Sequence, residues 1–188
     1  RFTVAAVLTV VLGVGANATI FSVLNPLLFK PLPYPEPERI VNVFRTSPQS
    51  DRWPHAMGNY LDHRDRNTSF EHLTAMMVRD ASLADPDQPA ERLLGIRASG
   101  NFFAVFGGAP LIGRAFDASD DKPGAAPVAV LSHRLWQRRF AGDRGIVGRS
   151  IRLDGQETTV IGVMPENYEY PLFWGPIEIW RPLAFPAE

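Results

Sequence analysis

The chain has 188 residues, of which 45% are hydrophobic and 21% charged, a composition typical of a folded globular protein. Its formal net charge of -1 offers no basic field to a nucleic-acid backbone, so we expect no nucleic acid among its partners. The chain contains no cysteine, which excludes disulfides, Cys-type zinc sites, iron–sulfur clusters and a thiol nucleophile.

The first thirty residues are set apart because no charge occurs between Arg1 and Lys30, whereas all 20 acidic residues follow Lys30. About 20 apolar residues cross a bilayer core as a helix, so the sequence predicts a transmembrane helix over residues 1–30. A secretory signal cleaved near residues 16–18 and a buried hairpin of a soluble protein are alternatives. The apolar run continues past Ile20, which favours the span.

Small and polar residues recur at every fourth position of this run and share one ridge of the helix: Ala5, Thr9, Gly13 and Asn17. Small residues let a second membrane helix approach closely, and an asparagine inside a bilayer requires a hydrogen-bond partner. We interpret the ridge as a helix-packing face toward the remaining transmembrane helices of the same protein. The alternative is a chance pattern in a stretch rich in valine, alanine and glycine.

A proline-rich linker follows at residues 31–38, with Pro31, Pro33, Pro35 and Pro37 in alternation. This spacing favours an extended polyproline II segment, which is stiff. A plain helix terminator with a linker explains the prolines as well. The remainder, residues 39–188, is predicted to form one domain.

The domain begins with residues 40–45, whose alternating apolar and polar side chains predict a strand. Residues 59–67 are polar and charged, which predicts a surface helix. We expect Tyr60, Leu61 and Phe70 to make its buried contacts.

Residues 81–98 contain two short apolar runs around a break of proline and aspartate, which predicts a hairpin or long loop. The segment should end in a strand at 93–98. Ser99 or Asn101 is suited to cap a short helix that the glycine pair beginning at Gly107 ends.

Residues 128–131 read as a buried strand, and Ser132 as the N-cap of a helix. Trp136 and Phe140 share one face of that helix, which Gly142 ends. The Asp-Gly pair at 154–155 favours a two-residue type I′ turn between two strands.

That turn joins strands at 150–153 and 156–163 and places Arg152 opposite Glu157. One more strand is expected at 177–180. Helices interleaved with hairpins indicate an α+β fold rather than a doubly wound sheet. The aromatic residues near the end form either an exposed recognition patch or part of the core, and we favour the core: Tyr168, Tyr170, Phe173, Trp174 and Trp180.

Three histidines with two nearby aspartates are the only candidate metal cluster: His55, His63, His72, Asp62 and Asp65. Two helical histidines that bind one ion are usually four residues apart, and these are eight and nine apart, so surface histidines explain them better. Ser132 and His133 adjoin without a third orienting group, and the paired carboxylates Asp120 and Asp121 lie in a loop where we expect them to be solvated. The sequence predicts no catalytic, cofactor-binding or metal-binding residue.

Five blocks in order resemble the FtsX/MacB-type ABC transporter permeases, in particular the duplicated orphan permeases of acidobacteria: residues 13–41, 59–73, 100–116, 127–140 and 146–165. The resemblance implies a MacB-like periplasmic core domain inserted after the first transmembrane helix. It implies localisation to the bacterial inner membrane, with the N-terminus in the cytoplasm and the domain in the periplasm. The periplasmic domain is expected to be truncated at its C-terminal end.

The resemblance also implies a subunit that is not an enzyme and works with a separate ABC ATPase, as a permease dimer or a duplicated half. Motion driven by ATP would be relayed through the linker to a domain that acts on cargo or on a periplasmic partner protein. The alternative function is a membrane-tethered binding or scaffolding domain without a role in transport.

Overall fold

The computed structural model describes residues 2–28, 34–53, 55–85, 88–168 and 175–184. The chain divides into two compact units, Arg1–Pro33 and Tyr34–Glu188. The first contains α1, a 27-residue helix over Phe2–Leu28. A search of the described residues finds no helix with the length and hydropathy of a membrane span. The predicted helix is therefore confirmed, and the predicted span is not.

Two of the predicted helix-packing residues lie one turn apart on α1. The side-chain Nδ2 of Asn17 donates to the carbonyl of Gly13 at 2.9 Å, so the amide finds its partner within the helix. Both residues are exposed. The side chains of Ala5 and Thr9 lie outside the described residues, and the packing face stays a prediction.

The linker is described only from Tyr34 onward, which leaves Pro31 and Pro33 outside the described residues. Tyr34 packs edge-to-face on Phe106, with ring centroids 5.1 Å apart. Pro35 lies so close to Gly107 that a Cβ there would come within 2.8 Å of the proline Cδ. The second half of the linker is thus fixed to the domain.

The polyproline II conformation expected through Pro37 is not maintained. Glu36 has a left-handed φ of 45°, and Pro37–Arg39 form a short 3₁₀ helix, η1. The backbone N–H of Arg39 donates to the carbonyl of Glu36 at 2.9 Å, and its guanidinium contacts the Glu36 carboxylate at 2.5 Å. These bonds close a turn where the sequence predicted an extended strut.

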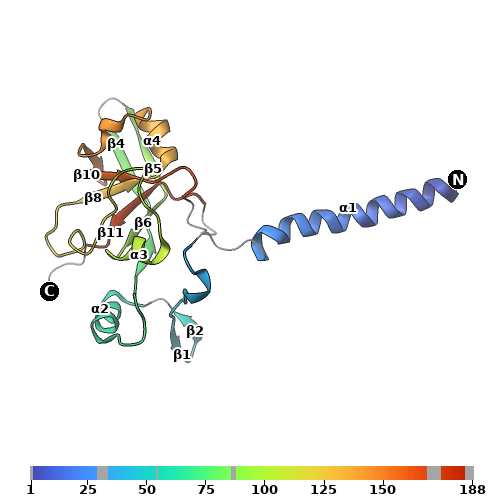
Figure 1. Cartoon of the computed structure of the whole chain (residues 1–188), viewed down its shortest axis with the longest axis horizontal. Coiled ribbons are helices and arrows are strands. Elements are labelled where there is room, and N and C mark those ends of the chain that lie inside the picture. Colours follow the sequence, from blue (N-terminus) through green and yellow to red (C-terminus); the bar gives the residue numbers. More distant parts are fainter. Residues whose placement is uncertain (1, 29–33, 54, 86–87, 169–174, 185–188) are drawn as a thin grey trace. The chain divides into compact units, whose positions relative to one another are not determined.

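The second unit is built on a nine-stranded mixed sheet of order β3-β6-β11-β8-β10-β9-β4-β5, with β7 paired to β10 (Figure 1). Its strands are β3 (Met76–Val78), β4 (Ala81–Asp85), β5 (Gln88–Leu93), β6 (Gly95–Ala98), β7 (Ile112–Gly113), β8 (Val128–Leu131), β9 (Ser150–Leu153), β10 (Gln156–Val163) and β11 (Ile179–Pro182). The strands predicted around 81–98, 128–131 and 150–163 are confirmed, and the last strand begins two residues later than expected.

Two strand pairs in this sheet are parallel. β10 pairs with β8, and β11 pairs with β6. The connection from β8 to β10 runs through α4 (His133–Phe140), the 3₁₀ helix η2 (Arg144–Ile146) and β9. The other pairs are antiparallel, so the expected α+β class is confirmed.

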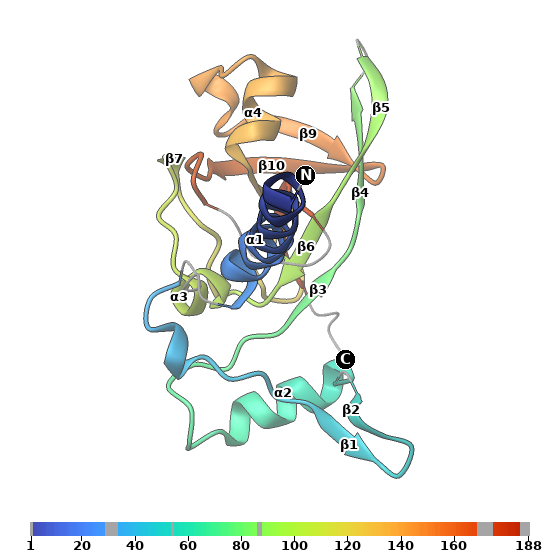
Figure 2. The ribbon, with the colours of Figure 1, turned by 90° about the vertical axis from the view of Figure 1, so that its right-hand side faces the viewer.

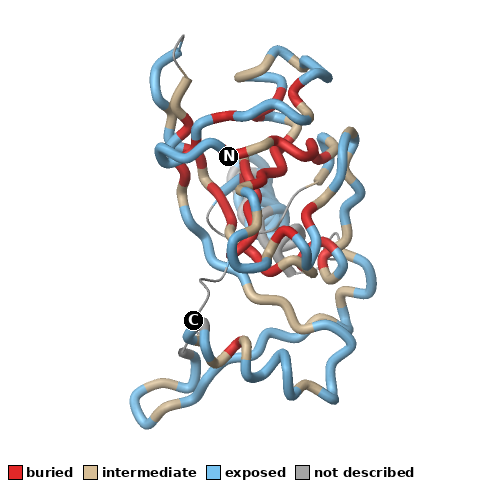
Figure 3. Tube along the Cα trace, turned by 90° about the vertical axis from the view of Figure 1, so that its left-hand side faces the viewer, coloured by how far each residue is buried: buried red, intermediate tan, exposed pale blue. Residues whose placement is uncertain are grey.

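Each face of the sheet carries its own apolar cluster. On one face α4 and η2 cover Leu131 and Leu153, and Leu135 and Ile146 are fully buried there. On the other face α3 (Phe102–Phe106) covers a second cluster, which includes Ile96, Val130 and Trp180. Figure 3 shows the buried residues gathered in the sheet and in the helices against it.

The local signals around β9 and α4 are confirmed. Asp154 and Gly155 have φ angles of 53° and 81°, as a type I′ turn requires, and Arg152 lies opposite Glu157. Ser132 caps α4, because its Oγ accepts the backbone N–H of Leu135 at 3.1 Å. Asn101 sits at the N-cap position of α3 but makes no side-chain cap bond.

A smaller lobe contains β1 (Arg45–Ser47), β2 (Ser50–Trp53) and α2 (Met57–Arg66) (Figure 2). The strand predicted at 40–45 is wrong except at Arg45: Ile40 packs against the second apolar cluster, but Val41 and Val43, which follow it, are exposed. The predicted helix is confirmed as α2. Tyr60 is buried, but Phe70 is 44% exposed, contrary to expectation.

Candidate functional site

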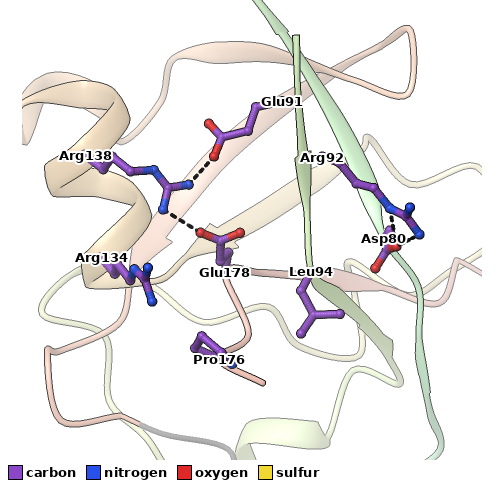
Figure 4. A pocket seen from close by; sticks show the side chains of 8 residues that line it. All are labelled: Asp80, Glu91, Arg92, Leu94, Arg134, Arg138, Pro176 and Glu178. Atoms are coloured by element: carbon purple, nitrogen blue, oxygen red, sulfur yellow. Dashed lines mark hydrogen bonds and ion pairs between the residues drawn. The ribbon is translucent and has the colours of Figure 1, made fainter. Parts of the chain in front are cut away.

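A charged hollow opens beside α4, with a volume of about 470 Å³. Four separate parts of the chain line it, as Figure 4 shows: Asp80, Glu91, Arg92, Leu94, Arg134, Arg138, Pro176 and Glu178. The two arginines of α4 lie one turn apart on the helix and so project from the same side. No spacing in the sequence indicates this site, because its residues come from β5, α4 and loops.

Ion pairs organise the hollow. Arg138 bridges two carboxylates, contacting Glu91 with one nitrogen and Glu178 with the other, the latter at 2.8 Å. Arg92 donates through Nε to Asp80 at 2.6 Å. The two pairs of Arg138 tie α4 to β5 and to the segment that precedes β11, and the pair of Arg92 ties β5 to the residue before β4.

Arg134 is the remaining cation of the hollow, and its side chain has no hydrogen bond or ion pair with any described residue. The three carboxylates each have an arginine partner, and none lies beside a serine, histidine or lysine within the lining. The arrangement can therefore accept a polar group of a ligand or partner protein. It does not have the nucleophile and base of a hydrolytic centre.

The histidines of the candidate metal cluster separate into two places. The rings of His55 and His63 are in contact, with centroids 5.3 Å apart in an edge-to-face arrangement. Among the described residues, no group of three or more histidine, aspartate or glutamate side chains is placed to hold a metal ion. His72 is exposed.

The two carboxylates expected to be solvated are not. Asp120 is 8% exposed and accepts both terminal nitrogens of Arg114, at 2.6 and 2.8 Å. Asp121 is half-buried and accepts the backbone N–H groups of Gly100 and Ala184. The prediction failed because this loop folds against the domain and its carboxylates complete backbone and arginine hydrogen bonds.

Replacing Asp120 with asparagine should lower the free energy of unfolding by about 1–2 kcal/mol at pH 7, a range that allows for the half-exposed arginine. The hydrogen bonds from Arg114 hold the pKa of Asp120 below its usual value. Stability from a depressed carboxyl pKa is present above the unfolded pKa, near 4, and is lost as the pH falls through the folded pKa. The difference between the two proteins in urea unfolding should therefore shrink below about pH 4.

Asp121→Asn is the matched control, since burial raises the pKa of Asp121. Ionisation of this carboxyl costs stability once the pH exceeds the unfolded pKa. The free energy of unfolding of Asp121→Asn, relative to that of the unmodified protein, should therefore increase as the pH rises. For Asp120→Asn this difference should change in the opposite direction. Equal pH dependence in the two variants would contradict both assignments.

The aromatic residues near the end of the chain are described only in part, because residues 169–174 lie outside the described ranges. Trp180 is buried in the core and the partly buried Tyr168 packs against it, with ring centroids 5.6 Å apart. The Tyr168 hydroxyl also donates to the carbonyl of Gly107 at 3.1 Å. For these two residues the core interpretation is confirmed. The predictions for Tyr170, Phe173 and Trp174 lie outside the described residues.

Two solved structures are similar in fold. The extracellular domain of the noncanonic ABC-type transporter YknZ from Gram-positive bacteria aligns with a TM-score of 0.52 and 15% identity, over 66% of this chain and 60% of that one. The periplasmic region of MacB from Actinobacillus actinomycetemcomitans aligns with a TM-score of 0.54 and 14% identity, over 69% of this chain and 62% of that one. The chain thus spans about three fifths of each solved domain.

No curated protein matches the sequence. The family model of the MacB-like periplasmic core domain matches residues 3–185, nearly the whole chain. This match agrees with the fold likeness and with the mixed sheet described above. The chain therefore belongs to the MacB-like periplasmic core domain family.

Proposed function

We propose that this chain is the first membrane span and the periplasmic domain of an ABC transporter permease, and that it relays ATP-driven motion across the membrane. In this proposal α1 is anchored in the inner membrane and the second unit lies in the periplasm. ATP hydrolysis is supplied by a separate ABC ATPase subunit. The chain itself carries no catalytic step.

The observation that carries the proposal is the extent of the family match. It begins at residue 3, so it includes α1 as well as the domain. The helix of 27 residues extends about 40 Å, which exceeds the thickness of a bilayer core, and its sequence contains no charge. Washing membranes with alkaline carbonate should leave the chain in the membrane fraction. Its release into the wash would contradict the anchor.

The linker contacts favour a relay over a loose tether. Tyr34 and Pro35 are held against Phe106 and Gly107 at the end of α3. The aromatic side chains of α3 pack in turn on the sheet through Phe103, whose ring centroid lies 6.4 Å from that of Trp180. A displacement at the linker would therefore reach the sheet through packed side chains, which transmit strain.

Replacing Pro31, Pro33, Pro35 and Pro37 with glycine should uncouple the domain from ATP hydrolysis, because glycine-rich segments are flexible coils. The test uses the whole permease with its ATPase, labelled at Ala18→Cys on α1 and Gln137→Cys on α4. This chain has no native cysteine, so within it the spin labels attach only to the two introduced cysteines. ATP should change the distance between the labels in the unmodified permease and not in the glycine variant, while ATP hydrolysis continues.

The matched control replaces two exposed prolines outside the linker, Pro48 and Pro123, with glycine. This control should keep the ATP-dependent change in distance. An unaltered response in the linker variant would rule out the relay. No response in any protein, including the unmodified permease, would favour the second candidate, a tethered binding or scaffolding domain, for which the charged hollow beside α4 provides a surface.

A further inference from the structure

Three arginines of adjacent strands share one face of the sheet at its β3 end. In the parallel pair of β6 and β11, Arg97 lies directly opposite Arg181. Arg79 follows β3, and its backbone N–H donates to the carbonyl of Gly95 at 2.9 Å. Neighbouring strands are about 4.8 Å apart, so the first two guanidinium groups originate side by side.

Among the described residues, the one carboxylate that forms an ion pair with these three arginines is Asp154, at the tip of the β9–β10 hairpin. It accepts Nη1 of Arg181 at 2.8 Å. The charges that influence Arg97 are those of Arg181, Arg79 and Asp154, and burial with the two like charges lowers the pKa of Arg97. Three guanidinium groups against one carboxylate leave an excess of two positive charges.

Hydrogen-bond donors in the cluster lack partners although they are shielded from water. The side chain of Arg181 is 8% exposed, and its Nη2 has no hydrogen-bond partner among the described residues. The Nε of Arg97 is likewise buried and has no partner within the described part of the chain. Arginine does not lose its proton in proteins, and a buried polar group without a partner is costly, so these two donors favour a bound anion that would accept their hydrogen bonds.

We propose that Arg97 and Arg181, assisted by Arg79, bind a phosphate-type dianion on this face of the sheet. Two negative charges match the local excess of two positive charges, whereas a single carboxylate would balance only one. Guanidinium groups bind phosphate oxygens through paired N–H donors. Arg97 is partly exposed and Arg79 is exposed, and their side chains give the anion an approach from solvent.

The test measures the thermal midpoint of the full chain in a mild detergent against inorganic phosphate, with potassium chloride at equal ionic strength as reference. Above the Kd, each tenfold rise in phosphate should raise the midpoint by about 3–6 °C. A second arm uses glycerol 3-phosphate at the same concentration as inorganic phosphate. A larger shift of the midpoint with glycerol 3-phosphate indicates a phosphate ester as the ligand, and a larger shift with inorganic phosphate indicates free phosphate. Acetate should give no shift, and a shift equal to that of phosphate would overturn the assignment to a dianion.

Three variants locate the site. Arg97→Gln should weaken phosphate binding by about tenfold or more, because it removes one bidentate donor. Arg152→Gln, at an exposed arginine on β9, is the matched control and should bind as the unmodified chain does. A phosphate shift that is absent, or that survives undiminished in Arg97→Gln, would overturn the proposal.

Asp154→Asn, the third variant, gives a second readout that a purely structural ion pair would not produce. The variant loses the pair with Arg181, so its midpoint without phosphate should fall. Its affinity for phosphate should rise about threefold to tenfold, because the one competing negative charge is gone. Asparagine tolerates the left-handed φ of 53° at this position, so the turn is retained. If Asp154→Asn lowered both the thermal midpoint and the affinity for phosphate, the proposed phosphate site would be contradicted.

Discussion

Replacing Trp180 with alanine should lower the free energy of unfolding by about 3–5 kcal/mol, the largest loss that we expect from a single truncation in the domain. Trp180 is 1% exposed and lies on β11, an interior strand of the sheet. Its ring contacts those of Phe103 and Tyr168, with centroids 6.4 and 5.6 Å away. The truncation opens a cavity where the sheet meets α3. Urea unfolding of the full chain in a mild detergent, followed by far-ultraviolet circular dichroism, measures the loss.

Trp180→Phe separates cavity formation from hydrogen bonding. The indole Nε1 is buried and has no hydrogen-bond partner among the described residues. Phenylalanine removes that N–H and keeps an aromatic ring in place, so the loss of volume and the relief of an unsatisfied donor oppose each other. The variant should lie within about 1.5 kcal/mol of the unmodified protein. A loss as large as that of the alanine variant would mean that the N–H has a partner that stabilises the fold.

The elements that the sequence predicts best are those whose signals are local. The type I′ turn depends on Asp154 and Gly155 alone, because only their left-handed φ angles are needed to set the register of β9 and β10. The start of α4 depends on the hydroxyl of Ser132, three residues before the N–H that it accepts. In both cases the decisive contact lies within a few residues.

The parallel pairs could not be predicted in this way. β6 and β11 are separated along the chain by about half of the domain, and neither strand carries a sequence signal that identifies the other. Residues 40–45 show the opposite failure: they alternate like a strand, but only Ile40 packs against a core cluster, and Val41 and Val43 are exposed. Alternating apolar and polar residues form a strand only where other parts of the protein cover the apolar face.

The charged surfaces could not be predicted either, because their ion pairs form only when the folded chain brings the charges together. The hollow beside α4 joins Arg138 to Glu91 and Glu178, which are distant along the sequence. Asp120 was expected to be solvated because its loop is rich in glycine, proline and alanine, yet Arg114, six residues earlier, pairs with it through two hydrogen bonds. Loop composition predicts the backbone and does not predict which charges the folded loop brings together.

Replacing Gly162 with alanine should cost about 3 kcal/mol, near the upper end of what overpacking of a protein interior costs. β10 and β7 cross here at two glycines, because Gly162 lies opposite Gly113. A Cβ on Gly162 would lie 2.3 Å from the carbonyl oxygen of Arg114. This neighbour is backbone, and β10 is held by β8 on its other side, so neither strand can withdraw without breaking ladder hydrogen bonds. Urea unfolding measures the loss.

Gly58→Ala is the matched control for that substitution. Gly58 lies in α2, is exposed, and has no atom within 4 Å of the place that a Cβ would take. Alanine is the better helix former, so this variant should gain up to about 1 kcal/mol. The same chemical change is therefore expected to act with opposite signs at the two sites. If Gly162→Ala also stabilised the protein, β7 and β10 would not approach as closely as their glycine pair implies, and the segment after α3 would have to leave the edge of the sheet.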